Sequence, residues 1–169
     1  KIVVDYPTPA EEVEIVQRMG VRPPQPRESL SIAALAQLQE AVDDIFVARE
    51  VIDYAVSLVL ATREPDRFGL ADLRELVSYG ASPRATLGLI AAGRALALMR
   101  GRSYVLPQDV FDVAPDILRH RLVLSYEALA RDLSVDDVLG RFLSTVPAPR
   151  VAPSQHQSAV HAAVNAPTA

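Results

Sequence analysis

One arginine in this sequence is well placed to do chemistry, because it lies at the expected start of a long apolar helix. Arg84 follows Ser82, a helix-capping residue, and Pro83, which is favoured at the first helical position. The helix dipole disfavours a cation there, so a guanidinium adds to an anion-binding site rather than neutralising one. Its planar donor fork matches phosphate oxygens. The structural alternative is an ion pair with a nearby carboxylate such as Glu75.

Other charged groups favour structural roles. The pairs Asp43 with Asp44 and Asp136 with Asp137 could suggest acid–base chemistry, but they fall near expected helix ends, where we expect solvated carboxylates. The basic segment 118–122 (LRHRL) could contact a phosphate or a neighbouring subunit, although an exposed face is favoured. No metal site is predicted, because none of the three histidines has the spacing of a zinc ligand: His120, His156 and His161.

The composition indicates a helical domain and excludes several functions. Of the 169 residues, 50% are hydrophobic but only 5% are aromatic, so the core is built from aliphatic side chains that suit helices. A net charge of −4 argues against a dedicated nucleic-acid binder. The absence of Cys excludes thiolate chemistry, and the chain contains no phosphate-binding P-loop motif. No apolar run reaches the length of about 20 residues that a membrane span needs, and the cytoplasm is the expected compartment.

Pattern and capping signals predict the elements that hold Arg84. A strand is expected over residues 2–6, and a helix follows from Thr8 to Gly20, with Glu11 completing a capping box. We expect this helix to bury Val13, Ile15, Val16 and Met19. A strand without a partner, in a chain that starts with Lys1, indicates part of a longer protein.

Four further helices are expected downstream. They start near Ser31, near Val51, at Pro107 and after Ser134, and Pro115 is expected to end or kink the third of them. The Arg84 helix should run to about Arg100, and because it is apolar on most sides we expect it to be buried. Residues 147–169 are rich in Pro, Ala, Ser and Gln and are expected to form a disordered tail.

Several motifs resemble the lid of MoxR-type AAA+ ATPases. The elements GASPRA, LPQDV and LRHRL occur in the order found in that family, and the stretch VDYPTPAEEVEIVQRM is also similar. The resemblance implies a mainly α fold, a helical-bundle lid domain preceded by the last strand of an α/β nucleotide-binding core. The resemblance covers most of residues 1–146. Together with the composition, it divides the chain into the end of the core (residues 1–22), a Pro-rich linker (23–30), the lid (31–146) and the tail (147–169).

The resemblance also assigns roles at a nucleotide site. Arg84 matches the sensor 2 arginine, a catalytic residue that reaches the γ-phosphate of ATP bound in the same subunit. Tyr6 and Pro7 match the hinge beside the adenine, while Ser82, Pro83 and Ala85 match the helix start beside the nucleotide. The resemblance implies ATP and Mg²⁺ as cofactors of the longer protein, a hexameric ring, chaperone-like action on client proteins and partners with von Willebrand factor A domains.

Two other interpretations stay open from the residues alone. A stand-alone helical interaction module would have no nucleotide role. A helix-turn-helix DNA binder would use the Arg84 helix for recognition, but that helix is apolar and the chain is acidic, whereas base edges must be read by polar groups.

Overall fold

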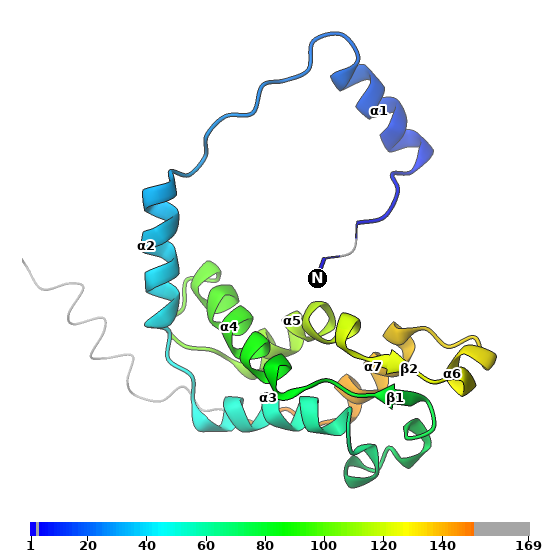
Figure 1. Cartoon of the computed structure of the whole chain (residues 1–169). Helices are drawn as coiled ribbons and strands as arrows, with labels where there is room; N and C mark the ends of the chain where they lie inside the picture. Colours follow the sequence, from blue (N-terminus) through cyan, green and yellow to red (C-terminus); the bar gives the residue numbers. More distant parts are fainter. Residues whose placement is uncertain (3, 151–169) are drawn as a thin grey trace, which may run out of the picture.

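The computed structural model describes residues 1, 2 and 4–150 and shows a mainly helical chain (Figure 1). A short antiparallel pair of strands, β1 (Val77–Tyr79) and β2 (Val123–Leu124), lies at one end of the helical bundle. Two short 3-10 helices, η1 (Pro65–Phe68) and η2 (Ala71–Leu73), precede β1. The helices are α1 (Pro9–Met19), α2 (Ile32–Asp43), α3 (Arg49–Ala61), α4 (Pro83–Met99), α5 (Pro107–Leu118), α6 (Tyr126–Ala130) and α7 (Val135–Thr145).

The core of the bundle forms where α3, α4, α5 and α7 meet. The fully buried hydrophobic side chains are aliphatic with one aromatic ring, that of Phe142. The approach of α4 to α5 depends on Gly93, because a Cβ atom there would lie 3.3 Å from Val105 Cγ1 and 3.6 Å from Val110 Cγ2. Close packing of this kind fixes the axis of α4, and therefore the direction in which its N-terminal end points.

Residues 4–30 form an N-terminal arm that stands away from this bundle, whereas the Lys1 amino group lies beside α5 and donates to the Asp116 C=O at 3.0 Å (Figure 1). The predicted capping box of α1 is confirmed, since the Glu11 carboxylate accepts from the Thr8 N–H at 2.7 Å. The predicted buried face of α1 is wrong: the side chains expected inside are exposed by 49–69%, namely Val13, Ile15, Val16 and Met19. The reason is that α1 packs on no helix of the bundle in the described part of the chain, so its apolar stripe has nothing to cover it.

The prediction of a strand over residues 2–6 is also wrong for the residues that the structure describes. Val3 lies outside them. Residues 2 and 4–6 belong to no strand, because a strand needs a neighbouring strand for its backbone hydrogen bonds and none lies beside them in the described chain.

Two expectations about the central helices need correction. Of the two outcomes expected at Pro115, an end of the helix is wrong: α5 continues to Leu118, because the fully buried side chains of Ala114 and Leu118 hold it against the core and offset the missing hydrogen bond. Helix α4 is buried only in part: Leu89 is fully buried, whereas Leu87 is 72% exposed. Ile90 and Leu98 are half-buried against the core, so the large apolar side chains of α4 that stay exposed are Leu87 and Met99.

The remaining expectations concern the tail and the membrane. Of the expected tail, residues 151–169 lie outside the described residues. Over the described chain, no helix is both long enough and apolar enough to cross a bilayer.

Candidate functional site

The first turn of α4 presents an arginine without a counter-ion. Arg84 is exposed, and its guanidinium takes part in none of the ion pairs or side-chain hydrogen bonds of the described chain. Glu75, the carboxylate that the structural alternative required, therefore does not pair with it. By contrast, Arg49 also lies in the first turn of a helix, and its Nε donates to Asp53 Oδ1 at 2.9 Å. The unfavourable interaction of an arginine with the positive end of the helix dipole is thus offset by an ion pair for Arg49 but not for Arg84.

In the described chain, the capping arrangement leaves polar groups without partners at this helix start. Ser82 is the N-cap in extended conformation, but its side chain makes no capping hydrogen bond, and Pro83 has no N–H to satisfy. Ala85 N–H donates to Ser82 C=O at 2.8 Å, and the Ala85 side chain is fully buried, which anchors the turn on the core. The Ser82 hydroxyl and the Arg84 guanidinium are therefore both available to phosphate oxygens, and these residues fit a nucleotide phosphate.

The loop leading into α4 rests on the C-terminal end of α3. Thr62 is only 2% exposed, and its Oγ1 accepts a hydrogen bond from the Ala81 N–H at 2.9 Å. Gly80 lies against the Thr62 backbone and borders a 690 Å³ hollow between the end of α3, η1 and β1. The chain passes from β1 across this end of α3 to the start of α4 (Figure 1). No sequence motif singled out Thr62, because its partner is nineteen residues away along the chain.

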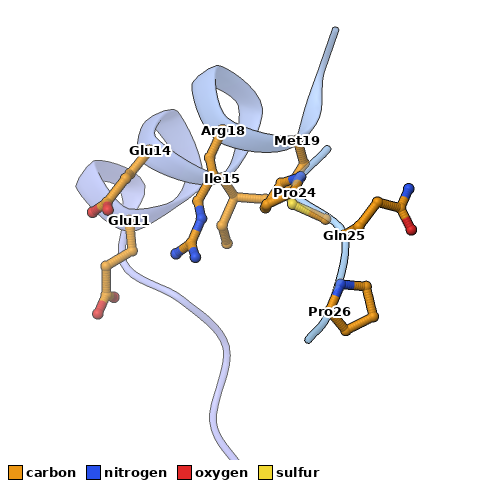
Figure 2. Close-up of a pocket in the computed structure, with 8 residues that line it drawn as sticks. All are labelled: Glu11, Glu14, Ile15, Arg18, Met19, Pro24, Gln25 and Pro26. Carbon is orange, nitrogen blue, oxygen red and sulfur yellow. The ribbon is translucent and has the colours of Figure 1, made fainter. Parts of the chain in front are cut away.

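The two other predicted nucleotide residues lie on the N-terminal arm. Tyr6 is 98% exposed, and in the described residues no hydrogen bond links Tyr6 or Pro7 to the start of α4. A hollow on this arm lies between α1 and the Pro-rich segment, where Ile15 and Met19 lie toward Pro24 (Figure 2). The structure thus brings together Ser82, Pro83, Arg84 and Ala85 but not the adenine-side pair.

A buried carboxylate that the sequence analysis missed connects α4 to α5. Asp109 is fully buried and accepts from Arg102 Nη1 at 2.7 Å, from Arg100 Nη1 at 2.8 Å and from the Leu106 N–H at 2.8 Å. Burial raises the pKa of Asp109, but the hydrogen bonds from Arg102, Leu106 and Arg100 outweigh burial and hold the pKa below its usual value. This cluster fixes the C-terminal end of α4 and is structural.

The other charged candidates lie at helix ends or in ion pairs. Asp43 and Asp44 are exposed at the end of α2, and Asp137 completes a capping box with Ser134. The exposed face expected for residues 118–122 is not found for Arg119, which is half-buried and whose Nε donates to Asp136 Oδ1 at 2.7 Å. In the described residues, no group of His, Asp and Glu side chains is arranged to hold a metal ion.

Comparison with known proteins places this geometry in a family. Residues 71–141 match the family model of the AAA lid domain. The chain is 54% identical to Chaperone MoxR1 of Mycobacterium tuberculosis over 151 residues, which is 89% of this chain and 40% of that protein. It is 38% identical to Protein MoxR of Paracoccus denitrificans over 102 residues, covering 57% of this chain and 30% of that one.

A solved structure has the same fold. The crystal structure of a "putative ATPase" from Cytophaga hutchinsonii superposes with a TM-score of 0.81 at 30% identity, covering 87% of this chain and 45% of that one. The chain therefore spans less than half of the length of these relatives. The order of its motifs, the helical bundle and these matches agree: the chain belongs to the MoxR-type AAA+ family and contains its AAA lid domain.

Proposed function

We propose that this chain is the lid of an AAA+ ATPase and that Arg84 binds the γ-phosphate of ATP held in the same subunit, as a sensor 2 arginine. The observation that carries the proposal is the exposed guanidinium of Arg84, which lacks a counter-ion within the described chain, in the first turn of a helix fixed by the core. An unneutralised cation at a positive helix end is unfavourable in isolation, and an anionic ligand removes that cost.

The residues at the start of α4 have distinct roles in this proposal. Arg84 donates to phosphate oxygens, and Ser82 offers a hydroxyl beside it, while the burial of Ala85 holds the turn in place. Tyr6 and Pro7 contact the adenine from the N-terminal arm. ATP with Mg²⁺ supplies the phosphoryl group that is transferred to water. A lid that holds the γ-phosphate changes its position when that phosphate leaves, which couples hydrolysis to motion.

The proposal extends to the longer protein. It works as a hexameric ring in the cytoplasm, remodels or assembles client proteins in a chaperone-like way, and acts with partners that contain von Willebrand factor A domains. Support comes from the relative named Chaperone MoxR1 and from the solved structure named as an ATPase. The second candidate, a helical interaction module without a nucleotide role, is favoured by the exposed apolar stripe of α1.

Hydrolysis of ATP in the longer protein distinguishes the two candidates. The protein that contains this lid is compared with its Arg84→Ala variant and with Arg49→Ala as a matched control. Arg49 also occupies a helix start, but it is already ion-paired with Asp53. The lid proposal expects only Arg84→Ala to lose activity, whereas equal activity of all three proteins favours the interaction module.

The chain of 169 residues alone is expected not to hydrolyse ATP. Its sequence has no P-loop motif and no acidic Mg²⁺ site, and these groups hold the phosphates and the metal during phosphoryl transfer. The measurement is phosphate release by the purified chain against a matched blank. Turnover that co-purifies with the chain and disappears in the Arg84→Ala variant would contradict this expectation.

A further inference from the structure

We infer that Thr62, at the C-terminal end of α3, is a positioning residue that holds Arg84 in its phosphate-binding place. This inference rests on the proposed function of Arg84 and adds a residue that touches no nucleotide. Three observations support it: the hydrogen bonds of the Thr62 hydroxyl, the close approach of Gly80, and the short rigid path from Ala81 to Arg84.

The Thr62 hydroxyl both donates and accepts a hydrogen bond. It donates to the Val59 C=O at 2.7 Å, which fixes its rotamer on α3, and it accepts from the Ala81 N–H at 2.9 Å, which ties the incoming loop to α3. Ala81 is fully buried, so its N–H has no access to water when this acceptor is lost. A buried donor without a partner is costly, and the loop would move to satisfy it.

The Thr62 backbone also limits how closely the same loop can approach α3. A Cβ atom at Gly80 would lie 2.3 Å from Thr62 O and 2.6 Å from Thr62 C, both backbone atoms that cannot turn away. Only glycine therefore fits beside Thr62. The hydrogen bond holds the loop against the end of α3, and the steric contact at Gly80 prevents a closer approach. Together they define the position of the loop.

The position of this loop is passed on to Arg84 through two residues. Ser82 is extended, with ψ of 166°, and Pro83 has its φ angle locked by the ring. A displacement of Ala81 therefore reaches Arg84 with little room for compensation. Misplacement of a functional group by 1 Å can reduce a rate by about 100-fold, so an anchor at Ala81 matters for a phosphate contact.

The test uses the longer protein and two ligands, a non-hydrolysable ATP analogue and ADP. Thr62→Val removes the hydroxyl with little change of shape, and it is expected to weaken the binding of the ATP analogue about fivefold to tenfold, as expected for one lost hydrogen bond. The binding of ADP, which has no γ-phosphate, should stay unchanged. Thr62→Ser keeps the hydroxyl and should restore binding of the analogue.

Two further variants keep the test decisive. Ser57→Ala on the same helix removes a hydroxyl whose one hydrogen bond within the described residues goes to the Asp53 carbonyl, and it should bind both ligands like the unmodified protein. Gly80→Ala displaces the loop while leaving the hydroxyl in place, and it should reproduce the selective loss if Thr62→Val does not fold. Hydrogen exchange at the Ala81 amide should accelerate in Thr62→Val.

The outcomes separate this inference from the proposed function. If Arg84→Ala loses the preference for the ATP analogue while folded Thr62→Val and Gly80→Ala keep it, Thr62 does not position Arg84 and the sensor 2 proposal stands. If Arg84→Ala itself keeps that preference, the proposed function fails and the inference fails with it. A loss of both ligands to the same extent in Thr62→Val, without rescue by Thr62→Ser, also overturns the inference.

Discussion

Replacement of Arg84 by alanine in the longer protein is expected to lower ATP hydrolysis more than tenfold without unfolding the lid. A hydrogen bond to a charged group contributes about 1.5–3 kcal/mol, which corresponds to a weakening of ATP affinity by roughly one to two orders of magnitude. If the contact strengthens as charge shifts on the γ-phosphate, turnover falls further than affinity does. The fold should survive, because the exposed side chain makes no contact that the core needs.

The measurement is steady-state hydrolysis at saturating ATP, with circular dichroism to check folding. Arg84→Lys should recover activity only in part, since an ammonium group lacks the planar donor fork. Arg49→Ala should match the unmodified protein, because the i,i+4 pair that it removes is exposed and such surface pairs contribute little to stability. A folded Arg84→Ala protein with full turnover and full ATP affinity would mean that Arg84 is an ordinary surface residue.

Replacement of Asp109 by alanine is expected to cause the largest loss of stability, about 3 kcal/mol, at the lower end of the range for breaking a buried ion pair. Asp109 is fully buried, and its removal leaves Arg100, Arg102 and the Leu106 N–H without their shared acceptor. The value lies at the lower end because the Arg100 and Arg102 side chains stay 41% and 20% exposed and can be partly hydrated.

Urea unfolding of the chain at pH 7 measures this effect, with Asp53→Ala as a control that removes an exposed carboxylate. The pH dependence provides a second check. The folded state lowers the pKa of Asp109, so its contribution to stability is complete above the unfolded pKa of about 3.9 and is lost as pH falls through the lower folded pKa. If Asp109→Ala unfolds at the same urea concentration as Asp53→Ala, the cluster does not stabilise the bundle.

Local signals in the sequence predicted the start of α4 correctly. A capping serine, a proline at the first helical position and an apolar run determine where that helix begins, whatever surrounds it. The same kind of signal placed α1, but its apolar stripe predicted burial that the described chain does not provide. Amphipathic spacing shows which face of a helix prefers a partner and does not say where that partner lies.

Contacts between distant residues could not be predicted in this way. The Thr62 hydroxyl meets Ala81 only because the chain turns back through η1, η2 and β1. Asp109 was missed for the same reason, because its burial depends on how Arg100 and Arg102 fold over it. These two residues fix the two ends of α4, and their roles follow from the packing of the bundle.

Binding of nucleotide to the longer protein tests the central claim most directly. The dissociation constants of a non-hydrolysable ATP analogue and of ADP are measured by calorimetry for the unmodified protein and for Arg84→Ala. If Arg84 binds the γ-phosphate, the variant loses about tenfold or more in affinity for the analogue and keeps its affinity for ADP. An unchanged ratio of the two constants in a folded Arg84→Ala protein would contradict the account.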